Sequence, residues 1–174
     1  MTHVQEVICP VGSYCLGGTA VKCSPGSFAN MTGQSACNAC PIGSVSSNLG
    51  SWNCTRCSTG YFQPALGGRF CQRCSIRTFN TELGSSACTA CPDHSSEADG
   101  VRDHCVCDIG FFEMSTGGDC LPCPPGANCL STGSTLSNLL PNKGSWSDSN
   151  SLNYYECPFT EACIATANSP CALG

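Results

Sequence analysis

The chain has few charged residues and no long apolar segment. Only 11% of its 174 residues are charged, and the net charge of −5 is spread thinly, with no run of Lys or Arg that could follow a phosphate backbone. No stretch reaches the roughly 18 to 20 apolar residues of a membrane-spanning helix. These absences argue against nucleic acid as a partner and against a membrane span in this segment.

Groups that carry catalysis are also scarce. The chain has three histidines, His3, His94 and His104, and only His104 adjoins a cysteine. A Cys-His pair inside a loop saturated with cysteine is a poor candidate for a nucleophile and its base. We find no phosphate-binding glycine loop and no metalloprotease helix. The sequence predicts no enzyme, no catalytic residue and no cofactor.

Cysteine is the residue that the chain has in abundance. There are 19 cysteines, 19 glycines and 11 prolines, which leave too little aliphatic surface for one continuous core. This composition predicts a disulfide scaffold, in which covalent closure replaces apolar burial. Disulfides persist in oxidising compartments, so we expect an extracellular or cell-surface location reached through the secretory pathway.

Two further features bear on that location. Residues 1–8 lack the basic and apolar regions of a signal peptide, so we expect a fragment of a longer ectodomain or a chain whose true beginning is missing. Asn30 and Asn53 begin glycosylation sequons, of which Asn53-Cys54-Thr55 is the weaker, and glycans there would fit a secreted protein.

The cysteines follow a regular period. CxxC pairs recur at a step of 17 residues, which is the signature of a tandem repeat array. The four pairs are Cys37/Cys40, Cys54/Cys57, Cys71/Cys74 and Cys88/Cys91. We call the second cysteine of each pair the leading cysteine of the module that follows it. The same interval joins Cys23 to Cys37 and Cys91 to Cys105, and Cys107 to Cys120 is one residue shorter.

The spacing favours a simple pairing, in which each leading cysteine bonds to the first cysteine of the next pair. A ring of about 15 residues contributes roughly 3 kcal/mol by constraining the unfolded chain. Crossed or nested bonds between neighbouring pairs stay open as alternatives. The favoured bonds are Cys23–Cys37, Cys40–Cys54, Cys57–Cys71, Cys74–Cys88, Cys91–Cys105 and Cys107–Cys120.

Two chemical alternatives use the same motif. Paired CxxC motifs also bind structural zinc, but zinc would consume the pairs two by two and leave the other cysteines ill matched. A redox CxxC requires a helix start in a thioredoxin-like α/β fold, and no helical pattern flanks any pair. We therefore predict disulfides and no metal site.

The residues within the rings predict short hairpins. Glycine recurs three and ten residues after the leading cysteine, where a turn needs positive φ, and an apolar residue recurs at the fifth position, where it would cover a disulfide. The fifth-position residues are Phe28, Val45, Phe62, Phe79 and Phe112. The predicted fold class is small disulfide-rich repeats: an extended rod of short β-hairpin-like modules with little helix.

One module departs from this pattern. The segment from Cys91 to Cys105 has His94 where most of the other modules carry glycine, and it is rich in acidic residues, including Glu97, Asp99 and Asp103. We interpret it as a looser, solvated acidic loop. Calcium binding in residues 91–108 stays open as an alternative, although the spacing matches no EF-hand loop.

A family resemblance accompanies these patterns. A CxxC followed by P-x-G-S/T-F/Y, a glycine turn and another CxxC resembles the ephrin-receptor-like cysteine-rich repeats, which are similar in style to tumour necrosis factor receptor and EGF-like modules. Residues 37–44 and 120–127 carry the motif best, and residues 9–15 look like a shortened opening variant. The resemblance covers roughly residues 9–129 and implies an extracellular spacer, adhesion segment or filament component, as in large surface proteins of algae and other protists.

The expected organisation has three parts: a partial opening module (1–22), tandem repeats of about 17 residues (23–123) and an atypical closing unit with an aromatic, cysteine-poor segment (124–174). In that last part we expect Trp146 to pack on a disulfide or to anchor a partner. A Cys157–Cys163 bond is plausible. The pairing of Cys9, Cys15, Cys123, Cys129 and Cys171 stays open, and the odd cysteine count leaves one thiol without a partner in this chain.

These predictions combine into a function. We expect a non-catalytic extracellular structural or adhesion segment, whose partners are other protein chains of a cell-surface or filament assembly. The alternative is a ligand-binding receptor ectodomain that uses the Cys91 module or the aromatic tail as its contact.

Overall fold

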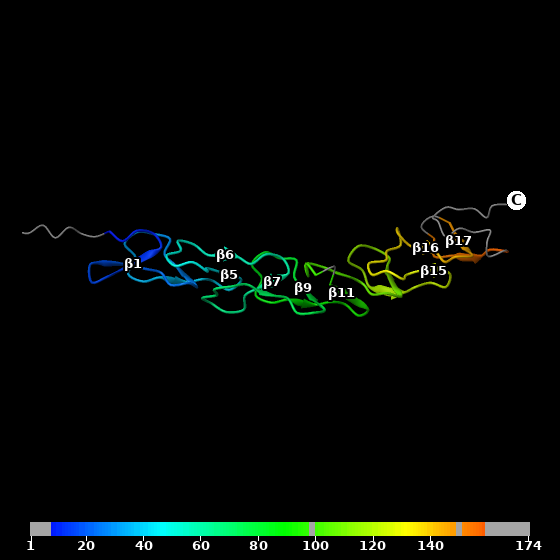
Figure 1. The fold of residues 1–174 in the computed structure, drawn as a ribbon, viewed down its shortest axis with the longest axis horizontal. Coiled ribbons are helices and arrows are strands. Elements are labelled where there is room, and N and C mark those ends of the chain that lie inside the picture. The colour runs from blue at the N-terminus through cyan, green and yellow to red at the C-terminus, as the bar shows by residue number, and fades with distance from the viewer. Residues whose placement is uncertain (1–7, 98–99, 149–150, 159–174) are drawn as a thin grey trace, which may run out of the picture. The chain divides into compact units, whose positions relative to one another are not determined.

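The computed structural model describes residues 8–97, 100–148 and 151–158, which fold entirely into short β-hairpins (Figure 1). Within these residues there is no helix, and each strand pairs with one partner to form a two-stranded sheet. Wherever the register is defined, the pairing is antiparallel. The predicted class of small disulfide-rich repeats made of short hairpins is confirmed.

Consecutive strands pair along the chain. The hairpins are β1 (Ser13–Leu16) with β2 (Thr19–Lys22), β3 (Ser27–Phe28) with β4 (Asn38–Ala39), β5 (Ser44–Val45) with β6 (Thr55–Arg56), β7 (Tyr61–Phe62) with β8 (Gln72–Arg73), β9 (Thr78–Phe79) with β10 (Thr89–Ala90), β11 (Ser95–Glu97) with β12 (Cys105–Cys107), β13 (Phe111–Glu113) with β14 (Cys120–Pro122), β15 (Ala127–Asn128) with β16 (Leu140–Pro141), and β17 (Ser145–Ser147) with β18 (Tyr154–Glu156).

The Cys40 module shows how the repeat forms a hairpin. After the leading cysteine, Gly43 has a φ of 79°, and a turn of this kind favours glycine because a side chain is strained there. Ser44 begins β5, and its Oγ donates to the carbonyl of Pro41 at 2.8 Å, which closes the turn. Gly50 reverses the chain again, and β6 occupies the two residues inside the next CxxC.

Five modules are each joined to the next by the same three backbone hydrogen bonds, which we call the inter-module ladder. In the Cys40 module, the amide of Gly43 donates to Gln63 O at 2.9 Å and the amide of Ser46 donates to Gly68 O at 3.1 Å. In return, the amide of Gly67 donates to Cys40 O at 2.8 Å. Equivalent bonds join the Cys9, Cys23, Cys57 and Cys107 modules to the modules that follow them.

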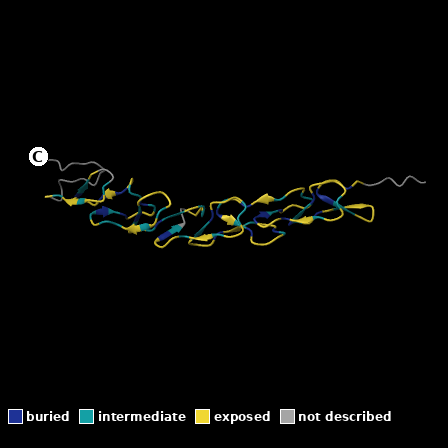
Figure 2. Cartoon of the chain, turned by 180° about the vertical axis from the view of Figure 1, so that it is seen from behind, coloured by how far each residue is buried: buried dark blue, intermediate teal, exposed yellow. Residues whose placement is uncertain are grey.

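The chain divides into two compact units: unit 1 comprises residues 1–89 and 101–104, and unit 2 comprises residues 90–100 and 105–174. In unit 1 the buried positions are short segments between exposed turns (Figure 2). Its fully buried side chains are Ala29 and the cysteines Cys9, Cys23, Cys40, Cys57 and Cys74. The fifth-position residues of unit 1 are only half-buried, so sulfur and backbone form most of the core.

Unit 2 has a small side-chain core instead. Phe112 is 2% exposed and packs with Ala127, Cys129 and Leu139, and Tyr154 packs against the same cluster. Here the fifth-position aromatic of the Cys107 module is a true core residue, because neighbouring modules supply apolar side chains to cover it.

The hairpin arrangement continues beyond Cys129, although the cysteine period stops there. Pro141 stands where a leading cysteine would be, and Gly144, three residues later, has a φ of 84°. The strands β17 and β18 follow, and the amide of Cys157 donates to Gly144 O at 2.9 Å, as a leading cysteine does in the other modules. The rings of Trp146 and Tyr155 stack across this hairpin, with centroids 4.9 Å apart.

Candidate interaction surface

The structure brings together all twelve cysteines of the six rings that the spacing favours. Each ring encloses one hairpin, and five of the six bonds join cysteines 14 residues apart. The sixth joins Cys107 and Cys120, 13 residues apart. The bonds are Cys23–Cys37, Cys40–Cys54, Cys57–Cys71, Cys74–Cys88, Cys91–Cys105 and Cys107–Cys120.

Two shorter loops involve cysteines whose pairing the spacing left open. Cys9 bonds to Cys15, and Cys123 bonds to Cys129, both across a separation of 6 residues. Both loops have the pattern C-P-x-G-x-x-C, which is the sequence signal that identifies them. Cys157 is also disulfide-bonded. Its plausible partner Cys163, like Cys171, lies outside the described residues.

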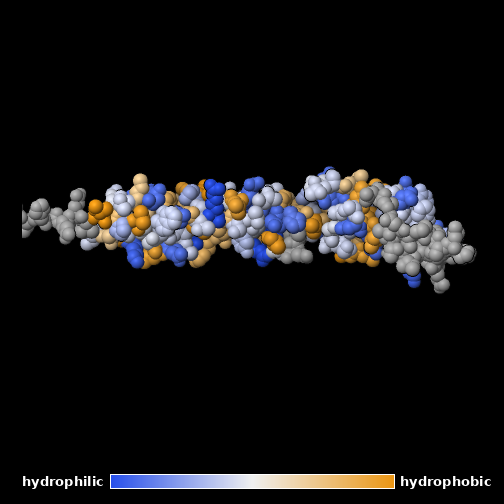
Figure 3. All heavy atoms as spheres, turned by 90° about the horizontal axis from the view of Figure 1, so that it is seen from above, coloured by the Kyte–Doolittle hydropathy of each residue, from blue (hydrophilic) through white to orange (hydrophobic). Residues whose placement is uncertain are grey.

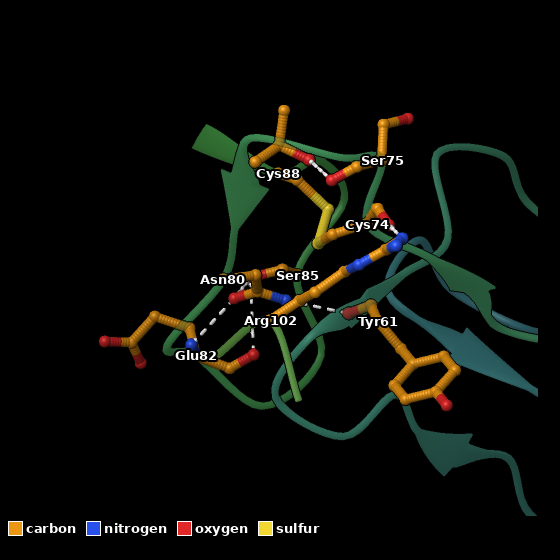
Figure 4. The surroundings of a disulfide bond; sticks show 9 residues. Tyr61, Cys74, Ser75, Asn80, Glu82, Ser85, Cys88 and Arg102 are labelled. Carbon is orange, nitrogen blue, oxygen red and sulfur yellow. Dashed lines mark hydrogen bonds between the residues drawn. A yellow bond between two sulfur atoms is a disulfide. The ribbon is translucent and has the colours of Figure 1, made fainter. Parts of the chain in front are cut away.

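In three modules of unit 1, the side chain at the sixth position organises the long turn of the hairpin. In the short loops this position holds the second cysteine, whereas Ser46, Gln63 and Asn80 are buried there. Asn80 shows the role most fully, because its Oδ1 accepts bonds from the Glu82 amide (2.7 Å) and Ser85 Oγ (2.8 Å), as Figure 4 shows. Its Nδ2 donates to Tyr61 O of the preceding module at 2.7 Å, so one side chain joins two modules.

The Cys91 module has His94 and Val101 at the third and tenth positions, where most modules carry glycine, and it uses an arginine at the equivalent interface. In the ladder, the carbonyl of a leading cysteine accepts a hydrogen bond from the amide of the tenth residue of the next module. At Cys74 the carbonyl instead accepts a hydrogen bond from Nη1 of Arg102 (Figure 4). Arg102 and His94 both have φ near 60°, a conformation that costs non-glycine residues about 1–2 kcal/mol. The sequence patterns did not reveal this role of Arg102.

The acidic residues of the Cys91 module are not gathered into a metal site among the described residues. Asp103 Oδ1 lies 2.6 Å from Nδ1 of His104, and the His94 ring stacks on Phe111 with centroids 4.0 Å apart. Asp99 lies outside the described residues. In the part of the chain that the structure describes, no three His, Cys, Asp or Glu side chains are grouped to hold a metal ion.

Both predicted glycosylation sites are solvent-exposed. Asn30 follows the fully buried Ala29, and Asn53 directly precedes the ring cysteine Cys54. An oligosaccharide at either position would project into solvent without displacing a buried side chain. Glycosylation of Asn30 and Asn53 stays a prediction.

Exposed apolar side chains are scattered among polar ones, as the face drawn in Figure 3 shows. Trp52 is 61% exposed and lines a surface hollow of about 500 Å³ with Leu49, Asn53 and the serines of the same turn. A second hollow of about 330 Å³ lies between modules of unit 1, where Ile42 and Leu83 flank Arg56. These hollows suit contact with another molecule and contain no paired acid and base groups.

The described residues contain no helix that is long and apolar enough to span a membrane. Residues 43–91 match the family described as tyrosine-protein kinase ephrin type A/B receptor-like, which confirms the resemblance for that stretch of about three modules. Together with the disulfides, this match indicates an extracellular, non-catalytic type of module. A search of curated proteins found no match.

Proposed function

We propose that this chain is a structural segment of an extracellular assembly, a disulfide-stapled spacer within a cell-surface or filament structure. The observation that supports this function most directly is the inter-module ladder, whose three hydrogen bonds recur at successive modules. Because five modules contact the next module through the same backbone groups, a segment can be lengthened by repetition without a new core.

The rings give such a segment resistance to stretching. In the Cys23 ring the two bonded Cα atoms lie 5.7 Å apart, whereas a fully extended chain of the same 14 steps spans about 50 Å. Pulling on an oxidised chain therefore cannot release the residues inside a ring. Reduction would add about 45 Å of extensible length for each ring.

The alternative function, a ligand-binding receptor ectodomain, draws on the exposed aromatic residues. Trp52 lines a hollow, and Tyr155 is 46% exposed beside the Trp146 ring. Aromatic side chains are frequent anchors of protein interfaces. A chain that captures one soluble partner from the medium as a monomer would favour this alternative.

Single-molecule force spectroscopy tests the spacer function. The chain is placed between two reference domains and stretched with and without a reductant. We expect the reduced chain to be longer than the oxidised chain by at least about 300 Å, of which the six rings contribute about 270 Å and the two short loops about 15 Å each. Equal contour lengths in the two states would contradict the proposal, because the rings would then not limit extension.

A further inference from the structure

The charged residues are sorted by sign between the two units. Unit 1 has six Lys or Arg and three Asp or Glu, which gives it a net charge of +3. Unit 2 has one Lys and nine Asp or Glu, which gives it a net charge of −8. The overall charge of −5 conceals this asymmetry. Opposite charges of this size attract at long range and steer association.

The basic side chains of unit 1 are presented at repeated positions. Lys22, Arg56 and Arg73 each directly precede a leading cysteine, at the ends of β2, β6 and β8, and all three are exposed. None of them makes an ion pair within the described residues. The aliphatic stems of Lys22 and Arg56 lie against the turn glycines Gly50 and Gly84, at 3.3 Å from where a Cβ would be. Such packing holds the stem while the charged group stays in solvent.

Apolar surface accompanies these charges. Arg56 shares its hollow with Ile42 and Leu83, which are 50% and 64% exposed. A partner that docks there would bury apolar side chains in addition to neutralising a cation, and burial contributes about 25 cal/mol per Å². The combination favours a protein surface as the occupant.

Unit 2 exposes the complementary groups. Asp119 and Asp148 lie in the loops between paired strands and Glu156 ends β18, and all three are exposed. Within the described residues these carboxylates have no cationic partner. They are therefore available to a basic surface of another molecule.

We propose that unit 1 of one copy of this chain docks on unit 2 of a second copy, head to tail. This inference rests on the proposed function, because it supplies the contact by which a spacer would assemble. A second copy is the occupant that the charges favour, because the chain itself carries both complementary surfaces. Contacts between two copies of unit 2, at −8 each, are opposed by repulsion. A contact between different surfaces does not close on itself, so copies would add in open chains.

Charge reversal on the full oxidised chain tests this contact by sedimentation velocity. The first variant carries Lys22→Glu, Arg56→Glu and Arg73→Glu, and the second carries Asp119→Lys, Asp148→Lys and Glu156→Lys. We expect wild type to form chains that lengthen with concentration and shorten as salt increases. Each variant alone should associate at least about tenfold more weakly, since several exposed ion pairs are lost. A control with Lys22→Arg, Arg56→Lys and Arg73→Lys keeps the charges and should associate like wild type.

The mixture of the two variants is the decisive sample. The first variant keeps a native unit 2 and the second keeps a native unit 1, so together they form one native contact. We expect the mixture to regain the association that neither variant shows alone. Three results would each overturn the proposal. The wild-type chain could stay monomeric at low salt, the variants could associate as strongly as wild type, or the mixture of variants could fail to combine. Force spectroscopy of the same variants separates the two ideas, because a spacer that resists stretching but stays monomeric contradicts only this inference.

Discussion

The two units stabilise the same hairpin in different ways. In unit 1 the backbone of one module approaches the backbone of the module two further along, so that a Cβ added at Gly43 would collide with the carbonyl of Gly84. The same relation joins Gly12 to Gly50, Gly26 to Gly67 and Gly60 to Val101. In unit 2, a Cβ at Gly110 would meet no atom within 4 Å, and an apolar cluster around Phe112 is present instead.

This difference shows what a repeat needs besides its disulfides. In unit 1, glycine at the third position lets backbones pack against each other, and a side-chain core is unnecessary. Arg77 and His94 occupy that position in two successive modules, and a Cβ there excludes such an approach. The hairpin that begins at Pro141 has no ring cysteine at its start and has a Trp146–Tyr155 stack across its strands.

The largest effect should come from adding one carbon to a turn of unit 1. We expect Gly43→Ala to destabilise its module by about 4 kcal/mol, from positive φ and from the collision with Gly84. Gly110→Ala, at the same position and with similar φ in unit 2, should cost about 1 kcal/mol. Hydrogen exchange measures both opening free energies. Equal costs would show that the backbone contact does not stabilise unit 1.

Removing the fifth-position aromatic residue should have the larger effect in unit 2. Phe112→Ala should cost about 3 kcal/mol because it leaves a cavity in the core of unit 2. Phe62→Ala should cost about 1 kcal/mol, because Phe62 is half-buried in unit 1. Urea unfolding of the two variants provides the measurement. A larger loss at Phe62 would mean that unit 1 also depends on a side-chain core.

A smaller effect concerns the polar sixth position. Asn80→Ala removes three hydrogen bonds, including the bond to Tyr61 of the preceding module, and we expect a loss of about 2 kcal/mol. Asn128→Ala, which removes one exposed bond to the Leu130 amide, should cost less than about 1 kcal/mol. Hydrogen exchange at the Glu82 amide should rise in the first variant only. Unchanged exchange there would rule out the role given to Asn80.

The smallest effect is a pH dependence in unit 2. Partial burial against the Phe112 cluster raises the pKa of the Tyr154 phenol above its ordinary value of 10.0. Above that value the unfolded chain would lose the proton that the folded chain keeps, so stability falls as the pH increases. Absorbance titration of wild type and Tyr154→Phe should differ by a phenol that ionises late. If the Tyr154→Phe variant instead lacks a phenol that ionises early, the burial of Tyr154 is contradicted.

Much of the fold follows from cysteine spacing. A period of 17 residues predicts rings and hairpins, because ring size and turn glycines leave few ways to place the strands. The motif in residues 37–44 also indicated the family that the match to residues 43–91 now supports. These features depend on residues that are close together in the chain, so sequence patterns indicate them.

The features that the sequence did not reveal depend on distant residues or on the backbone. The approach of Gly43 to Gly84 joins modules two apart, and nothing beside either glycine marks it. The hairpin after Pro141 keeps backbone hydrogen bonds without the cysteine that marked earlier modules. The charges are thinly spread along the sequence, and their sum hides the difference of sign between the two units.

Non-reducing peptide mapping by mass spectrometry of native material tests the account most directly. We expect peptides that join Cys23 to Cys37, Cys40 to Cys54, and each later leading cysteine to the first cysteine of the next pair. We also expect the short Cys9–Cys15 and Cys123–Cys129 loops. Predominantly reduced or metal-bound thiols, or crossed bonds between neighbouring modules, would contradict it.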